Sequence, residues 1–257
     1  MPGTLVLLPN SLGGSVQGVL PPIVEPWVQR LDGLIAESER GGRRYLEQFQ
    51  GLKHPPRMMP IAVWNDPQQR EDLTWFLEPL LQGEHWGFVS DAGMPCIADP
   101  GARLVARARE LNLEVVVLPG PSAPLMALLL SGLPSQQFCF HGYPPKEPTE
   151  RAHWVDRCVA ATGTHLCIEA PYRNRALLET LLERLPVGTK LCVALDLMQP
   201  SQEVWVRRVE EWGERQACVE DRPAVFLFHA KAGDREPLPR GGPVQRRSHH
   251  GGRGRGR

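Results

Sequence analysis

Residues 89–101 read VSDAGMPCIADPG, and this stretch decides the fold that the sequence predicts. The apolar run 86–89, WGFV, is typical of a buried strand. Apolar residues return at helical spacing over 104–111, with Asp99 predicted as the N-cap and Pro100 as the first helical residue. We therefore expect a loop between the carboxyl end of a strand and a helix, where open α/β sheets bind ligands.

A second stretch repeats this construction. Residues 113–118, LEVVVL, predict another strand, followed by the loop PGPSAP at 119–124 and an apolar helix through Leu130. Two consecutive strand–loop–helix units bring their loops to the same sheet edge. The small residues of both loops would let a ligand approach the backbone.

The two loops, SDAGMPCIADPG and LPGPSAPL, resemble those of the tetrapyrrole methylase family of S-adenosylmethionine-dependent methyltransferases. The resemblance is greatest to the branch that methylates ribose in small-subunit ribosomal RNA. Further matching anchors are Leu7-Leu8-Pro9, Gly33-Leu34-Ile35-Ala36-Glu37 with Arg40 and Arg43-Arg44, Phe140-His141-Gly142-Tyr143 and Glu169-Ala170-Pro171-Tyr172-Arg173. The chain departs from this branch at Asn10-Ser11, at Ser38, where the branch has aspartate, and at Gly41.

The resemblance implies an α/β protein of two domains, a mainly parallel N-terminal sheet and a mixed C-terminal sheet, with the cofactor cleft between them. The implied cofactor is S-adenosylmethionine, the implied substrate is RNA and the implied assembly is a homodimer. The positions that the resemblance assigns to the cofactor are Pro9, Ser90, Asp91, Ala92, Gly93, Met94, Ala98, Asp99, Ser122 and Tyr172. For Asp99, capping and ligand binding are compatible, because a capping carboxylate keeps a free oxygen.

A ribose hydroxyl is a poor nucleophile until it loses its proton, so a general base would help. The candidates near the inferred cleft are His141, Glu37, Glu39 and Glu169, and catalysis by positioning alone is the alternative. Two other functions stay open. One is methylation of a tetrapyrrole or another small molecule, which the missing GxGxGD loop disfavours, and the other is cofactor binding without catalysis.

We divide the chain into an N-terminal α/β domain (1–120), a C-terminal α/β domain (121–232) and a tail (233–257). In the first domain we expect strands at 4–8 and 34–36, an edge strand within 58–64, and a helix over 67–82 capped by Asn65-Asp66. The buried face of that helix should consist of Leu73, Phe76, Leu77, Leu80 and Leu81. In the second domain, strands at 137–141, 164–169, 190–197, 203–206 and 224–228 and a helix over 150–161 predict a mixed sheet.

Composition narrows the class of protein. The chain has 257 residues, 42% of them hydrophobic, which suffices for a substantial core. Its longest apolar run, 123–130, is shorter than the about 20 residues of a membrane span, and its first residues lack the pattern of a signal peptide. The six cysteines form no C-x-x-C pair and there is no H-x-x-x-H, so we expect free thiols in a cytoplasmic protein and no metal.

The charge is unevenly distributed. The formal net charge is zero, but the tail holds seven arginines against two acids, a net of +5, which leaves −5 for residues 1–232. We expect the tail to be disordered, either as an arm that attracts RNA phosphates or as a solvated extension. Arg40, Arg43 and Arg44 share one helical face, either as a phosphate contact or as partners of nearby glutamates.

Overall fold

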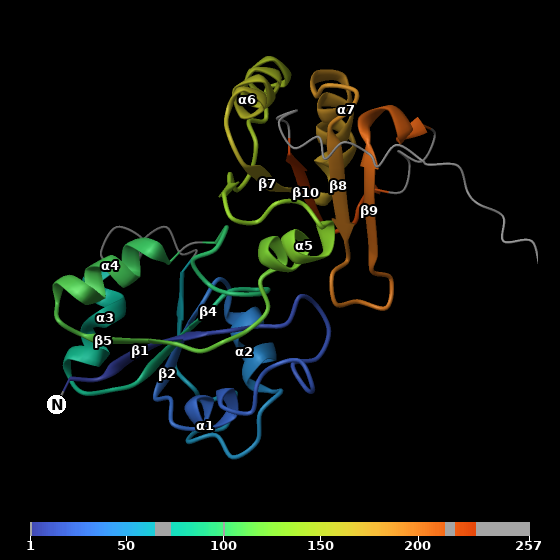
Figure 1. The fold of residues 1–257 in the computed structure, drawn as a ribbon. Helices are drawn as coiled ribbons and strands as arrows, with labels where there is room; N and C mark the ends of the chain where they lie inside the picture. Colours follow the sequence, from blue (N-terminus) through green and yellow to red (C-terminus); the bar gives the residue numbers. More distant parts are fainter. Residues whose placement is uncertain (1, 65–72, 100, 214–218, 230–257) are drawn as a thin grey trace, which may run out of the picture.

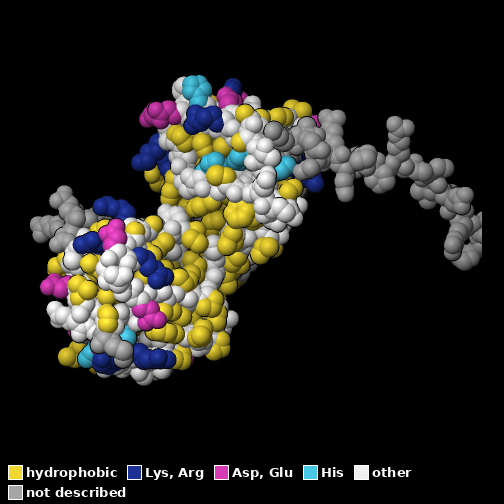
Figure 2. Space-filling view, turned by 60° about the vertical axis from the view of Figure 1, so that its left-hand side comes forward, with side chains coloured by type: hydrophobic (Ala, Val, Ile, Leu, Met, Phe, Trp, Pro, Cys, Tyr) yellow, Lys and Arg dark blue, Asp and Glu magenta, His cyan; other side chains and the backbone are white. Residues whose placement is uncertain are grey.

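The computed structural model describes residues 2–64, 73–99, 101–213 and 219–229. It contains two five-stranded sheets, each with helices, which form two lobes joined by a narrower waist (Figures 1 and 2). The predicted two-domain α/β fold is confirmed. The division at residue 120 remains a prediction, and the tail 233–257 lies outside the described residues.

The first sheet is entirely parallel, in the order β3-β2-β4-β1-β5. Its strands are β1 (Thr4–Leu8), β2 (Gly33–Ala36), β3 (Ile61–Val63), β4 (Trp86–Val89) and β5 (Glu114–Val117). Both β1 and β4 are buried throughout, as their unbroken apolar runs predict, and β3 is the expected edge strand. Because parallel strands end at the same edge, the loops after β1, β2, β4 and β5 converge there.

Helices cover both faces of this sheet. The helices α1 (Val24–Val28) and α2 (Glu39–Leu46) pack on one face, and α3 (Leu73–Leu81) and α4 (Ala102–Glu110) pack on the other. The predicted helix over 67–82 is described only from Leu73, so its cap at 65–66 lies outside the described residues. The prediction that Leu81 faces inward is wrong: at the last residue of α3 it is 48% exposed, whereas Phe76, Leu77 and Leu80 are buried.

The predicted start of α4 is wrong. The helix begins at Ala102 with Gly101 as its N-cap, so Asp99 does not cap it. Gly101 has a φ of +132°, and a Cβ there would lie 2.1 Å from the Phe88 ring. Only glycine fits so close to the sheet in that conformation, so the turn into the helix occurs at Gly101. The carboxylate of Asp99 is thereby left without a capping role.

The second sheet is mixed, in the order β6-β7-β10-β8-β9. Its strands are β6 (Phe138–Phe140), β7 (Thr164–Glu169), β8 (Lys190–Leu195), β9 (Glu203–Arg208) and β10 (Ala224–His229). The β6–β7 pair is parallel and the other pairs are antiparallel. The helices α6 (Pro148–Ala160) and α7 (Asn174–Arg184) pack on one face, and α5 (Ala123–Ser131) packs on the other.

The helix α7 was not predicted, although Leu177, Leu178 and Leu181 are fully buried against the second sheet. In the part of the chain that is described, no helix is long and apolar enough to cross a membrane.

Candidate active site

The loop after β1 is hydrogen-bonded to the loop after β4. The backbone N–H of Asn10 donates to the carbonyl of Gly93 at 2.8 Å, and the N–H of Gly93 donates to the carbonyl of Ser11 at 3.1 Å. The Asn10 side-chain amide donates to the carbonyls of Ser90 and Asp91, both at 3.0 Å. Asn10 thus fixes the path of the loop that follows the central strand β4.

The loop after β5 lies against the same two loops. A Cβ on Gly120 would lie 2.0 Å from the Pro9 Cβ and 3.3 Å from the Met94 sulfur. A Cβ on Gly93 would lie 3.4 Å from the carbonyl oxygen of Pro121. Glycine at these positions therefore allows three loops to meet, as expected from consecutive strand–loop–helix units.

Two buried hydroxyls in these loops lack partners. Ser90 is 1% exposed and Ser122 is 8% exposed, and neither Oγ has a hydrogen-bond partner within the described residues. Ser122 is the N-cap of α5, but its side chain does not bond the helix. An unpaired buried hydroxyl costs free energy, so such groups normally meet a ligand or a water molecule. The two hydroxyls are polar groups available to a ligand on two neighbouring loops.

Carboxylates gather beside these hydroxyls. Glu37, in the loop after β2, accepts the backbone N–H of Asp91 at 3.0 Å. Burial raises the pKa of Asp99 to about 6, and the nearby Glu37 and Asp91 carboxylates add to the increase. The Ser90 hydroxyl partly opposes it, because it lies near the Asp99 carboxylate, although the two groups do not reach hydrogen-bond geometry. This edge of the sheet is therefore electronegative, which favours ligand hydroxyl donors and positive charge.

The loop after β4 is held in uncommon backbone conformations. Cys96 and Ala98 have φ values of +69° and +68°, a region that residues with a Cβ seldom adopt. Backbone strain of this kind concentrates at ligand sites, where the surrounding structure enforces it. The strained segment separates the Ser90–Met94 turn from Asp99.

A sequence profile of the tetrapyrrole (corrin/porphyrin) methylases matches residues 21–212. This chain belongs to that family. Its members use S-adenosylmethionine.

Three curated relatives carry the name ribosomal RNA small subunit methyltransferase I. The Escherichia coli O157:H7 protein is 32% identical over 92% of this chain and 81% of its own length. The Xylella fastidiosa protein is 34% identical over 67% of this chain and 60% of its own length. The Mycobacterium tuberculosis H37Rv protein is 36% identical over 51% of this chain and 46% of its own length. The chain thus spans between 46% and 81% of these relatives.

Solved structures share the fold at low identity. The methyltransferase CobJ superposes with a TM-score of 0.61 at 17% identity, over 90% of this chain and 95% of that chain. Uroporphyrin-III-C-methyltransferase from Thermus thermophilus gives 0.55 at 18% identity, over 89% and 94% respectively. The chain therefore shares its two-sheet architecture with these solved structures.

The predicted cofactor positions other than Asp99, which is half-buried, fall into three groups. Pro9, Ser90, Gly93, Met94 and Ser122 are together where the three loops meet, as described above. The side chains of Asp91, Ala92 and Ala98 are exposed on the loop after β4. In the second domain, Tyr172 is 76% exposed in the turn after β7, with the Arg173 guanidinium 5.9 Å from its ring. A ligand role for each of these residues stays a prediction.

The four candidate bases have very different surroundings. Glu37 lies at the loop junction, whereas Glu39 is exposed and paired with Arg43 at 3.1 Å. Glu169 is buried, ion-paired with Arg173, and accepts the Ala170 N–H at 2.7 Å.

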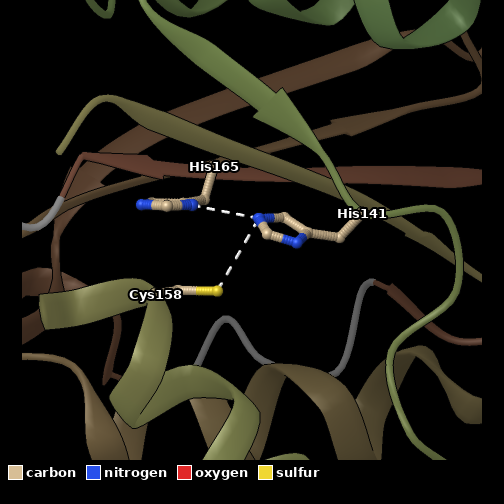
Figure 3. A group of neighbouring side chains, drawn as sticks. All are labelled: His141, Cys158 and His165. Atoms are coloured by element: carbon tan, nitrogen blue, oxygen red, sulfur yellow. Dashed lines mark hydrogen bonds between the residues drawn. The ribbon is translucent and has the colours of Figure 1, made fainter. Parts of the chain in front are cut away.

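His141 lies in a different environment. Its imidazole contacts His165 and Cys158 in the second domain (Figure 3), and burial lowers its pKa.

Several residues that hold the site together were missed from the sequence. The Tyr45 hydroxyl donates to the Pro9 carbonyl at 3.2 Å, and burial raises the Tyr45 pKa. The Gln199 amide donates to the carbonyls of Leu12 and Gly13 at 3.0 and 2.9 Å, which links the two domains. Tyr143, after β6, has its pKa raised by burial and then by Asp99, Glu169 and Glu37. Its phenol therefore lies within electrostatic range of carboxylates in both domains.

A shallow pocket lies elsewhere in the molecule, between α3 and the amino end of β4. Trp75, Pro79 and Trp86 line it, and Glu84 at its rim accepts the Trp86 indole N–H at 2.8 Å. Ligands of parallel sheets bind at the opposite, carboxyl ends of the strands. The loop junction is therefore the stronger candidate site.

Proposed function

We propose that this chain is an S-adenosylmethionine-dependent methyltransferase that acts on small-subunit ribosomal RNA, at a ribose 2′-hydroxyl. The names of its curated relatives support the RNA substrate. The single observation that carries the proposal is the junction of the three loops, where Ser90 and Ser122 keep buried hydroxyls without partners.

The residues present fit the cofactor. The unpaired hydroxyls of Ser90 and Ser122 would bond its polar groups, and the Met94 and Pro9 side chains would supply apolar contact. Asp99 would accept ribose hydroxyls or attract positive charge, with Asp91, Ala92, Gly93, Ala98 and Tyr172 completing the binding surface. When bound, S-adenosylmethionine supplies a methyl group that its sulfonium already activates. The chain contributes alignment and an electronegative surrounding.

Glu37 is the candidate base that the contacts favour. Its carboxylate lies beside the Asp91 backbone and influences both Asp99 and Tyr143. The other three candidates are each engaged by a neighbouring side chain: Glu39 by Arg43, Glu169 by Arg173 and His141 by His165. We infer that Glu37 would hold the acceptor hydroxyl by a hydrogen bond and accept its proton.

We infer that exposed arginines of α2 contact RNA phosphates. Arg40 and Arg44 are exposed, and among the described residues no ion pair involves them. Arg43 is committed elsewhere, because its guanidinium donates to the carbonyls of Pro56 and Met59. The patch predicted from helical spacing is therefore reduced to two arginines.

We also infer a homodimer, formed through the outer face of α5. Leu125, Leu129 and Leu130 are 44%, 80% and 47% exposed, and Val117 on the neighbouring edge strand β5 is 59% exposed. Exposed apolar side chains in such a group indicate a protein interface. In Figure 1, α5 lies between the two sheets, so a partner here would contact both domains.

We further infer a cytoplasmic location. Free thiols at Cys158, Cys167 and Cys192 support it, because thiols stay reduced in that compartment.

The proposal is tested by methyl transfer. Purified protein is incubated with labelled S-adenosylmethionine and small ribosomal subunits from cells that lack the gene, and the modified nucleotide is mapped by mass spectrometry. We expect label on one ribose of the small-subunit RNA, which Glu37→Gln reduces while adenosylhomocysteine still binds. Label on a tetrapyrrole instead of RNA, or cofactor binding without transfer to any acceptor, would refute it.

A further inference from the structure

A cluster of potential metal ligands lies in the second domain, away from the loop junction. His141 Nε2 and His165 Nδ1 are 3.0 Å apart, and Cys158 Sγ is 3.7 Å from His141 Nε2. All three ligand atoms lie within 4.8 Å of one another and point toward a common centre (Figure 3). Cys158 and His165 are each 3% exposed, and His141 is half-buried.

We propose that His141, Cys158 and His165 bind a zinc ion that fastens β6, α6 and β7 together. This site is independent of the proposed methyl transfer. The sequence alone led us to expect no metal, because it contains neither an H-x-x-x-H nor a C-x-x-C spacing. The proposed zinc site differs from that expectation.

The distances suit tetrahedral zinc. With Zn–N of about 2.0–2.1 Å and Zn–S of about 2.3 Å, neighbouring ligand atoms lie about 3.3–3.6 Å apart. The two measured separations, 3.0 and 3.7 Å, lie close to this range. Small rotations of the side chains would bring Cys158 and His165 to the same spacing. Two imidazoles and a thiolate suit a borderline-soft ion, whereas magnesium and calcium prefer oxygen ligands.

The topology explains how distant residues converge. His141 directly follows β6, Cys158 lies in the last turn of α6, and His165 is the second residue of β7. Parallel pairing places Cys139 of β6 opposite His165, and α6 crosses over the same two strands. One ion would therefore join three consecutive elements of a β-α-β unit.

Aromatic walls enclose the cluster. Trp154 lies edge-on to His141 with ring centroids 5.3 Å apart, and Phe228 stacks on His165 at 5.4 Å. Such walls fix ring orientation and limit water access, as around structural metal sites. The ion would also steady the turn that leads to Tyr143, two residues beyond His141.

Zinc content and cobalt spectroscopy test the site. The full chain, purified without an added tag, is stripped with chelator, reloaded with zinc, dialysed against micromolar free zinc and measured by mass spectrometry. We expect about one zinc ion per chain, and a higher melting temperature with zinc than without. Cobalt in place of zinc should give a thiolate-to-metal charge-transfer band in the near ultraviolet.

Matched variants assign the ligands. We expect Cys158→Ser to lose the charge-transfer band, and His141→Gln to lose most of the zinc. Cys192→Ser, which removes a buried thiol on β8 outside the cluster, should retain both. Less than a tenth of an equivalent of zinc in the wild-type chain, or an unchanged cobalt spectrum in Cys158→Ser, would overturn the proposal. The wild-type measurement remains decisive if a variant does not fold.

Discussion

The side-chain amide of Asn10 donates to the carbonyl oxygens of Ser90 and Asp91, both at 3.0 Å, and so joins the loop after β1 to the loop after β4. These residues are 80 and 81 positions apart in the chain. The shape of the proposed cofactor site therefore depends on a side chain that need not touch the cofactor.

Asn10→Asp should loosen this junction with almost no change in side-chain size. The new carboxylate cannot donate, and it faces two carbonyl oxygens. We expect a loss of about 1–3 kcal/mol in the free energy of unfolding and about tenfold weaker adenosylhomocysteine binding. Urea denaturation and calorimetric titration measure the two effects. Unchanged affinity would mean that the junction does not shape the site.

The raised pKa of Asp99 predicts a pH-dependent stability. Because the folded-state pKa is about 6 and the ordinary value is 3.8, the folded protein binds this proton more tightly than the unfolded chain between those pH values. Stability should therefore fall as pH rises from about 4 to 6, and then level off. Asp99→Asn should remove this dependence and add about 1–2 kcal/mol to the unfolding free energy at pH 7.

The same substitution should weaken cofactor binding. If the ionised Asp99 contacts S-adenosylmethionine, affinity in the wild-type chain should decline as pH falls through about 6, and Asp99→Asn should show low affinity at every pH. Calorimetric titrations from pH 5 to pH 8 test this. If Asp99→Asn showed the same dependence of affinity on pH as the wild-type chain, contact between Asp99 and the cofactor would be excluded.

The arginines of α2 should divide into two kinds. Arg40→Ala and Arg44→Ala should each lower the slope of log affinity for RNA against log salt by about 1, without loss of stability. Arg43→Ala should instead lower the unfolding free energy by about 1–3 kcal/mol, because it leaves the Pro56 and Met59 carbonyls without their donor. Filter binding over a salt series and chemical denaturation separate the effects. Equal salt slopes in all variants would contradict the RNA assignment.

Leu129→Glu should dissociate the proposed homodimer. The residue is 80% exposed, so a charge there costs a monomer little but would be buried in the interface. Light scattering coupled to size exclusion should give the monomer mass for the variant and the dimer mass for the wild type. Val187→Glu, at a 67% exposed valine between α7 and β8, is the matched control and should remain dimeric. A wild-type monomer at micromolar concentration would refute the dimer.

The sequence predicts the fold well where its patterns are local. Continuous apolar runs such as Trp86–Val89 locate buried strands, and the small residues in 89–101 correctly predict a loop between β4 and α4. The spacing of Leu177, Leu178 and Leu181 contained an equally good signal for α7, which was overlooked. The N-cap assigned to Asp99 failed because the close approach of Gly101 to Phe88 is a tertiary contact.

Residues that cooperate across the chain could not be predicted in the same way. Gln199 contacts Leu12 and Gly13 from more than 180 residues away, and no local pattern contains that information. His141, Cys158 and His165 converge only because β6 and β7 pair in parallel beneath α6. For these contacts topology, rather than residue spacing, provides the information.

The central claim is that the loops after β4 and β5 form one binding site for S-adenosylmethionine. Hydrogen–deuterium exchange with and without adenosylhomocysteine tests it most directly, because bound backbone segments exchange more slowly. We predict slower exchange in peptides from both loops, residues 90–99 and 118–124, at the same ligand concentration. Protection of only one loop, or of neither at saturating ligand, would contradict the account.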